Sequence, residues 1–199
     1  MPWAGATAQF DIPVFLKFGG IDCEFLWMSR RIRDRRDKVS LAEFDQFVGE
    51  SIGRYGQFLD RLIAPLGRAN LRVCSVFPSV MRDDCWVDGY LDAHRGSPEN
   101  NNALAEALKR VDVPDLRTRT ELRRRYNRSL RALCREKDLK FIDDFNPLLG
   151  ADGILDSRYL GAHGGRDFHL DIATSEAVLT KIIQSSITPP SNSADTGIT

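Results

Sequence analysis

The sequence predicts an α/β protein built around a parallel sheet, and three observations carry this prediction. Short apolar runs, each closed by Gly, Pro or Asp, are typical of buried parallel strands. Amphipathic segments with a period of three to four residues separate these runs and predict helices. The resulting alternation of strands and helices is typical of βαβ units with right-handed crossovers. With 199 residues, the chain is long enough for one domain with a core.

The first predicted strand lies close to the N-terminus. Residues 12–18 form an apolar run that contains Val and Phe, and Gly19 and Gly20 close it. Its length and composition are typical of a buried strand. Residues 29–38 are mostly Arg, Asp and Lys, and they predict a charged, irregular connection to the next element.

A long helix is predicted next. Ser40 and Glu43 form a capping box, in which each side chain satisfies a free backbone N–H of the first turn. Apolar residues then recur at spacings of three and four up to about Ala64, where Pro65 and Gly67 end the helix. The apolar positions are Leu41, Phe44, Phe47, Val48, Ile52, Tyr55, Phe58, Leu59 and Leu62.

The middle of the chain predicts a second strand followed by a long loop. Residues 71–77 form another apolar run, which Pro78 ends. Residues 79–101 contain Gly, Pro and two adjacent Asn, so they predict an irregular connection. Loops of that length are uncommon unless they are functional or disordered. A short helix is predicted over residues 103–110.

The next predicted elements are a helix and a third strand. Thr118 and Glu121 form another capping box, and the helix that they begin reaches about Lys137. The third strand covers residues 139–142, and residues 145–149 predict a helical turn. The inward face of the helix is formed by Leu122, Tyr126, Leu130 and Leu133.

A last helix is predicted over residues 172–187. Residues 188–199 are rich in Ser, Thr, Pro and Asp and offer little to bury, which predicts a disordered tail. Residues 1–187 therefore form a single predicted domain. The inward positions of the last helix are Ile172, Ser175, Val178, Leu179, Ile182 and Ile183.

Composition limits the class of protein. The formal net charge is +0, so no global field favours nucleic acid or an anionic membrane, and neither is a predicted partner. No apolar run approaches the length of a membrane span, and the N-terminus shows no signal-peptide pattern. The four cysteines form no C-x-x-C pair, and Cys74 and Cys134 fit core positions. These features predict a chain in a reducing compartment, the cytoplasm.

The candidate chemistry starts at Asp167 and His169, just before the last helix. An imidazole can take a proton from a nucleophile, and a carboxylate can hold its tautomer and stabilise the imidazolium. These two residues therefore fit the base half of a hydrolase site. A surface histidine at a helix start is the alternative interpretation of His169.

Parallel strands point the loops after them at one rim, where ligands bind. Gly19, Gly20 and Asp22 follow the first predicted strand and are candidates for the ligand-binding or oxyanion region. Asp22 fits this rim, and it equally fits a turn that it caps through its own backbone. The loops after the other two strands carry Pro78, Ser79, Asp143 and Asp144.

Several motifs together resemble the SGNH (GDSL-type) hydrolase superfamily. Residues 14–25 resemble its third sequence block, in a subgroup that reads Gly-x-(Ile/Val)-Asp. Residues 73–78, the Phe141-Ile142-Asp143 strand and the acidic loop 152–156 follow in the expected order. Residues 167–170 resemble the final Asp/His block, so the resemblance covers roughly residues 12–185.

The resemblance implies a three-layer αβα sandwich around a parallel sheet, and hydrolysis of an acyl ester or an acetylated carbohydrate without a cofactor. In the family, a nucleophilic Ser follows the first strand. Its N–H, a Gly N–H and an Asn side chain form the oxyanion hole. His169 would be the general base and Asp167 its orienting carboxylate.

The chain departs from the family pattern in three places. No Gly-Asp-Ser block occurs, so the domain is expected to be incomplete at its N-terminus. Ile21 stands where the family has the Asn donor, and one such donor contributes about 2.7–4 kcal/mol. Arg166 stands three residues before His169, where the family has Asp, and Asp167 is only two before. That shift changes the direction in which the carboxylate points.

The sequence therefore predicts an ester hydrolase-like protein that is possibly inactive as this chain. The alternative is a non-catalytic binding module for a carbohydrate, an acyl ligand or a protein partner. Without the family's first strand, residues 12–18 become an exposed apolar edge, which predicts self-association or a partner there.

Two further interpretations have less support. His163, His169 and Asp167 or Asp171 are metal-ligand types, but their spacing matches no known signature, so no metal is predicted. The eight Arg residues within 117–136 invite an RNA-binding interpretation. No aromatic residues are interleaved with them for base stacking, and a solvated helix face explains them equally well.

Overall fold

The computed structural model describes residues 12–94 and 98–187. Within them the protein is mixed α/β with a three-stranded parallel sheet in the order β1-β2-β3. The strands are β1 (Val14–Leu16), β2 (Leu71–Cys74) and β3 (Lys140–Ile142). This confirms the α/β class, the parallel sheet and the three predicted strands, each of which is shorter than expected. The predicted tail 188–199 lies outside the described residues.

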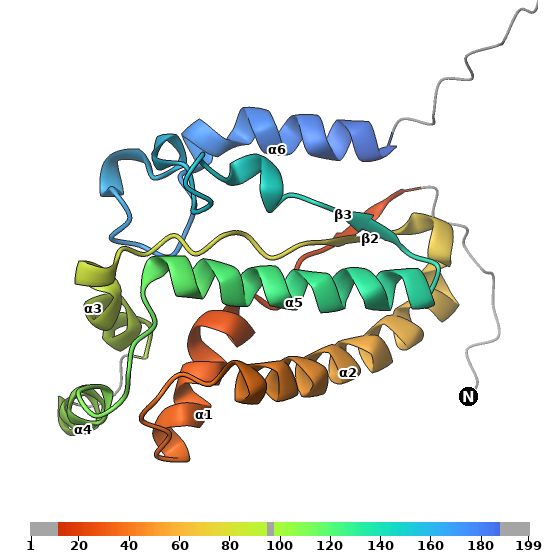
Figure 1. The fold of residues 1–199 in the computed structure, drawn as a ribbon. Coiled ribbons are helices and arrows are strands. Elements are labelled where there is room, and N and C mark those ends of the chain that lie inside the picture. The colour runs from red at the N-terminus through yellow and green to blue at the C-terminus, as the bar shows by residue number, and fades with distance from the viewer. Residues whose placement is uncertain (1–11, 95–97, 188–199) are drawn as a thin grey trace, which may run out of the picture.

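Helices lie on both sides of the sheet (Figure 1). Helices α2 (Leu41–Leu66) and α5 (Leu116–Glu136) pack together on one side, and α6 (Ile172–Ile187) runs along the other. Beyond the carboxyl ends of the strands lie the remaining three helices. These are α1 (Trp27–Arg33), α3 (Asp83–Ala93) and α4 (Pro98–Leu108).

Five shorter helical turns complete the described chain. A π-helical turn, η1 (Asp22–Leu26), leads directly into α1. The other four are 3₁₀ turns: η2 (Arg68–Asn70), η3 (Asn146–Leu148), η4 (Ser157–Tyr159) and η5 (Gly161–His163). η3 confirms the helical turn predicted over residues 145–149.

Capping side chains set where the two long helices begin. The Ser40 hydroxyl accepts a hydrogen bond from the Glu43 backbone N–H at 3.3 Å, as the sequence predicts. Helix α5 begins at Leu116 instead of Thr118, because the Asp115 carboxylate accepts from the Thr118 N–H at 2.7 Å. Asp115 accepts the bond from the third helical residue, as an N-cap side chain does.

The main core lies between α2, α5 and the sheet. Leu59, Val73 and Leu130 are completely buried there, and Cys134 belongs to the same cluster; Cys74 is also buried, as predicted. The amphipathic faces of α2 and α5 supply most of this cluster. Burying apolar area is the main favourable term in folding, so these two helices anchor the sheet.

The predicted charged connection over residues 29–38 is wrong for its first half, which belongs to α1. Arg31 looks like a surface residue in the sequence, but it is almost fully buried. Its guanidinium donates to the backbone oxygens of Asp112 at 2.7 Å and Asp37 at 3.1 Å. Trp27 and Met28 are buried beside it. The charge run therefore conceals a packed helix.

The predicted loop over residues 79–101 is also wrong, because it contains α3 and the start of α4. Trp86 and Tyr90 lie four residues apart on α3, and their buried rings stack at 4.9 Å. In the sequence, Gly89 was one of the residues that suggested a loop here. In the structure it is helical, and a Cβ there would overlap the Met81 side chain. Close packing explains this glycine.

The inward face predicted for α6 is only partly right. Ser175 is buried, and Val178, Leu179 and Ile182 are half-buried. Ile172 is 78% exposed and Ile183 is also exposed, so these two do not face the core. No helix in the described ranges is long and apolar enough to cross a membrane.

Strand β1 forms one edge of the described sheet, and Ile12 and Phe18 near its ends are 68% and 50% exposed. We expect self-association along residues 12–18, because an apolar strand edge is a template for pairing. Light scattering after size exclusion should show a species heavier than the 22.5 kDa monomer, growing with concentration. Ile12→Lys should reduce it and Ile187→Lys, on α6, should not. A monomer at every concentration would contradict the expectation.

Candidate functional site

A cavity of about 470 Å³ opens beyond the carboxyl ends of β1 and β2. In an open parallel sheet this is where ligands bind. Three of its walls are the turn after β1, the segment after β2 and the residues before α6. Its lining residues are Lys17, Phe18, Gly19, Gly20, Ile21, Asp22, Glu24, Phe25, Val76, Phe77, Arg123, Phe168 and His169. The structure thus brings Gly19, Gly20, Asp22 and His169 to one cavity.

The turn after β1 is shaped by Gly19 and the π-helical turn. Gly19 has a φ of +103°, and a Cβ on it would lie 2.6 Å from Cζ of Tyr126. The chain then turns at once into a helix, with the Cys23 N–H donating to the Gly19 oxygen at 3.1 Å. π-helical turns are rare and recur at functional sites. Here the turn directs Asp22 and Glu24 to the cavity wall.

Asp22 lines the cavity and does not simply cap its own turn. Its carboxylate accepts a hydrogen bond from the Ser51 hydroxyl at 3.0 Å. The Ser51 hydroxyl also lies 3.1 Å from the Tyr126 hydroxyl. This chain of polar contacts ties the turn after β1 to α2 and α5.

Asp167 and His169 are in contact despite their altered spacing. Oδ1 of Asp167 lies 2.9 Å from Nδ1 of His169 and 3.3 Å from its backbone nitrogen. Phe168 between them packs against Phe25 at 5.4 Å and lines the cavity. Phe168 is therefore the half-buried anchor of this segment, and the exposed Asp–His pair on either side of it lies at the rim.

The hydrogen bonds of Asp167 determine the tautomer of His169. Burial raises the pKa of the Asp167 carboxyl, but bonds from the His169 backbone and ring outweigh it, so this pKa is lowered. An ionised carboxylate only accepts hydrogen bonds, so Nδ1 of His169 carries the proton. In the neutral imidazole, Nε2 then keeps its lone pair, as a general base requires.

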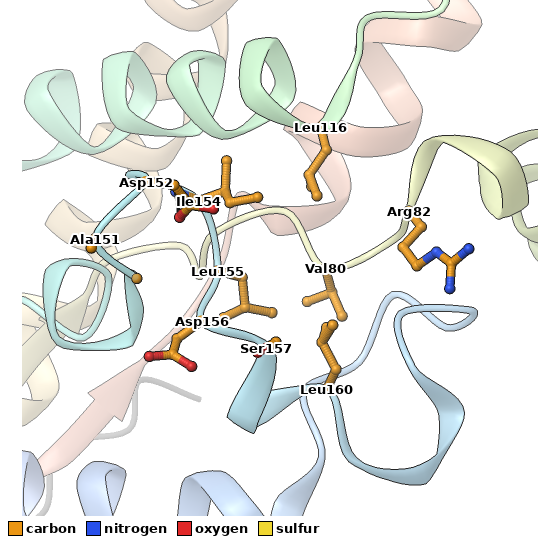
Figure 2. A pocket seen from close by; sticks show the side chains of 11 residues that line it. Val80, Arg82, Leu116, Ala151, Asp152, Ile154, Leu155, Asp156, Ser157 and Leu160 are labelled. Carbon is orange, nitrogen blue, oxygen red and sulfur yellow. Dashed lines mark hydrogen bonds between the residues drawn. The ribbon is translucent and has the colours of Figure 1, made fainter.

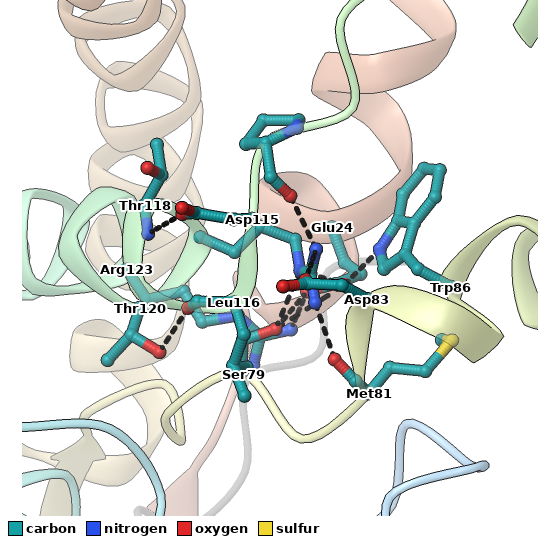
Figure 3. Close-up of polar contacts among 12 residues, drawn as sticks. Glu24, Ser79, Met81, Asp83, Trp86, Asp115, Leu116, Thr118, Thr120 and Arg123 are labelled. Carbon is teal, nitrogen blue, oxygen red and sulfur yellow. Dashed lines mark hydrogen bonds and ion pairs between the residues drawn. The ribbon is translucent and has the colours of Figure 1, made fainter. Parts of the chain in front are cut away.

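Sequence reasoning missed a buried polar network behind the cavity (Figure 3). The Glu24 carboxylate forms an ion pair with Arg123 and lies 3.6 Å from Arg119. It also accepts from the Trp86 indole at 2.7 Å and the Ser79 hydroxyl at 3.2 Å. Both arginines are buried, and Glu24 is the buried carboxylate that pairs with both; Arg119 also pairs with the exposed Asp83 at 2.9 Å.

A second polar network joins the ends of all three strands, and its members Ser75 and Asp144 are buried. Nζ of Lys17 donates to Oδ2 of Asp144 at 2.7 Å and to the Ser75 backbone oxygen. The Asp144 N–H donates to the Ser75 hydroxyl at 3.0 Å. Burial lowers the pKa of Lys17, and Asp144 opposes part of that shift. Lys17 also lies over the Phe77 ring, so the ammonium is anchored at the cavity floor.

The described part of the cavity wall contains no Ser, Thr or Cys. Cys23 follows Asp22 directly, but it is buried, and burial raises the pKa of its thiol well above the usual range. It therefore does not supply a thiolate. Ile21 is exposed at the cavity mouth and offers no side-chain donor for an oxyanion.

A separate hollow of about 530 Å³ lies between the segment after β2 and residues 150–160 (Figure 2). Val80, Leu116, Leu155 and Leu160 line it with apolar surface. No predicted site residue contributes to it. It contains no histidine in the described chain, so it lacks the base that the other cavity has.

No group of three or more potential metal ligands occurs among the described residues. Nδ1 of His163 accepts from the Gly165 N–H at 3.2 Å, and Asp171 accepts from Thr174 in the first turn of α6. The His163, Asp167, His169 and Asp171 combination is therefore not assembled as a metal site.

The arginines of α5 divide into two groups. Arg119 and Arg123 are buried against Glu24, so the solvated-face interpretation is wrong for them. Four of the exposed or half-exposed members, Arg124, Arg125, Arg128 and Arg131, pair with nearby carboxylates, as Arg125 does with Asp45 at 3.0 Å.

Comparison of the chain with protein-family models, curated proteins and solved structures found no match in any of the three.

Proposed function

We propose that this chain is an SGNH-type ester hydrolase-like protein whose cavity takes an acyl ester or an acetylated carbohydrate. The observation that carries the proposal is the Asp167–His169 pair at 2.9 Å on the rim of the cavity. A carboxylate that fixes the Nδ1–H tautomer leaves Nε2 ready to accept a proton from a nucleophile. The three-layer sandwich is part of this proposal, and helices on both sides of the sheet support it.

In this proposal each part of the cavity has one role. His169 is the general base and Asp167 orients it. Gly19, Gly20 and Asp22 form the wall against which the acyl group lies. The nucleophile is a hydroxyl from outside the described lining; the chain has serines at positions 97, 191 and 193, outside the described ranges.

The test is labelling of the full chain with a fluorophosphonate, followed by peptide mapping. We expect one labelled serine and a labelling rate at least about 100-fold slower in His169→Ala, because general-base catalysis contributes about 10²–10⁴. Asp167→Asn should slow it as well, since it removes the carboxylate that fixes the tautomer. His163→Ala is the matched control and should label at the normal rate.

A second candidate function is a binding module without catalysis. The absence of a hydroxyl or thiol from the described cavity wall and the exposed Ile21 favour it. Folded chain that takes no label, yet binds a neutral ester in the cavity by NMR, would support this function. The same result would contradict the hydrolase proposal.

A further inference from the structure

A hollow of about 290 Å³ lies against the face of α5 that carries Asn127. Helix α5 forms one wall, and β3 with the turn η3 forms the other. Arg124, Arg128 and Arg131 line it from α5. They lie at positions i, i+4 and i+7, so they share one face of the helix. Asn127, on the same face, is occupied by the backbone of Val76 and acts as wall.

Two aromatic rings support the guanidinium groups. Cζ of Arg124 lies 5.2 Å from the centre of the Phe145 ring, and Cζ of Arg131 lies 4.8 Å from that of Phe141. Phe145 is buried and therefore holds its position. A guanidinium that lies over a ring keeps its N–H edges free for other acceptors.

Protein acceptors use only part of this donor capacity. Arg131 donates to Asp143 at 2.7 Å, and Arg128 donates to Glu121 at 3.2 Å. Nε of Arg124 donates to the same Glu121 at 3.0 Å, and its Nη2 donates to the Gly153 backbone oxygen at 3.5 Å. Each guanidinium carries several N–H donors, so further donors remain in all three.

The charges around the hollow are also unbalanced. Glu121 is the shared carboxylate partner of Arg124 and Arg128, whereas Arg125 has Asp45 as its nearer partner. Asp143 is the single carboxylate in the lining, and backbone N–H groups of the η3 turn fix its position. A multivalent oxyanion would supply the missing negative charge and accept several of the free N–H donors at once.

We propose that this hollow binds a phosphoryl or sulfuryl group, free or on a small molecule. Planar, forked guanidinium groups match such tetrahedral oxyanions better than a single ammonium does. A hollow of this volume holds one such group and part of its carrier. The site is separate from the cavity at His169, and it does not depend on the proposed hydrolase function.

The experiment titrates the full chain with inorganic phosphate, sulfate and a phosphate monoester, observed by NMR of the backbone amides. Saturable shifts should centre on α5 and the η3 turn. Arg128→Gln should weaken binding at least about 5-fold, and raising the salt concentration should weaken it further. Arg135→Gln, an exposed arginine on the same helix outside the lining, is the matched control.

The titration separates the sources of the oxyanion. Tighter binding of the monoester than of phosphate would assign the site to a phosphorylated small molecule, and equal binding would assign it to the free ion. Equal weakening by Arg128→Gln and Arg135→Gln would overturn the proposal, because it would show attraction by net charge alone. Shifts at the hollow that saturate only with single-stranded RNA would also overturn it. Circular dichroism confirms that each variant is folded.

Discussion

Glu24→Gln is expected to lower the free energy of unfolding by about 3–5 kcal/mol, the cost of leaving buried charges without their partner. Glu24 is 4% exposed and pairs with both Arg119 and Arg123 in the interior, where the other partner of Arg119 is the exposed Asp83. Glutamine keeps the volume and an oxygen that can accept from Trp86, but its NH2 group cannot accept from Arg123, so the negative charge and one acceptor are lost together. Urea denaturation followed by circular dichroism measures the change.

The matched control for this variant is Glu50→Gln. Glu50 forms a surface ion pair with Arg30 at 2.6 Å. Exposed pairs are screened by water and salt, so this substitution should leave the urea midpoint nearly unchanged. Equal losses in the two variants would show that the buried network does not stabilise the fold through its charge.

The pH dependence of stability provides an independent readout of the same group. Burial raises the pKa of Glu24, but Arg123, Arg119 and the hydrogen bonds outweigh it and lower this pKa below its usual value of 4.5. The unfolded state then binds a proton first as the pH falls. The carboxylate therefore contributes its full stability above pH 4.5, and this contribution is lost as the pH falls through the folded-state pKa. Glu24→Gln should show a shallower loss over that acid range.

The sequence predicted best those elements whose signals are local. The Ser40–Glu43 cap and the recurring apolar positions placed α2 almost correctly, because both signals lie within the helix itself. The α6 bounds were also right. The two helices that were missed, α1 and α3, depend on contacts outside their own segments. The buried guanidinium of Arg31 donates hydrogen bonds to the backbone oxygens of Asp37 and Asp112. Asp112 lies about eighty residues away in the sequence.

The candidate site likewise has a part that the sequence predicted and a part that depends on contacts it could not show. The order of motifs brought Gly19, Asp22 and His169 to one cavity in the prediction, and the structure places all three there. Direct contact between Asp167 and His169 could not be derived from spacing, because it depends on the turn that Phe168 anchors.

The Glu24 network had almost no signal in the sequence. Its partners lie on three separate elements, and Arg119 and Arg123 stand among six other arginines of residues 117–135. One usable hint existed: Arg119 and Arg123 are four residues apart, and Leu122 and Tyr126 of the buried face are adjacent to this pair. If the buried face of this helix extends to Arg119 and Arg123, their charges need a buried carboxylate as a partner. The sequence does not say which carboxylate that is.

Gly19→Ala is expected to destabilise the fold by about 2–4 kcal/mol, from a strained backbone and an overpacked contact together. The φ of +103° at this position is one that alanine rarely adopts. Its Cβ would lie 2.6 Å from Cζ and 2.7 Å from the hydroxyl oxygen of Tyr126, which is itself buried. Either the ring moves or the turn after β1 does. Urea denaturation measures the loss.

Gly20→Ala separates this cause from a general effect of substitution in the turn. Gly20 has no heavy atom within 4 Å of an added Cβ and lies in the first helical turn, where alanine is favoured over glycine. It should leave stability unchanged or raise it slightly. If Gly19→Ala were equally harmless, the close approach of Tyr126 would not fix the turn. The cavity wall would then owe its shape to the Ser51–Asp22 contact, which Ser51→Ala would remove.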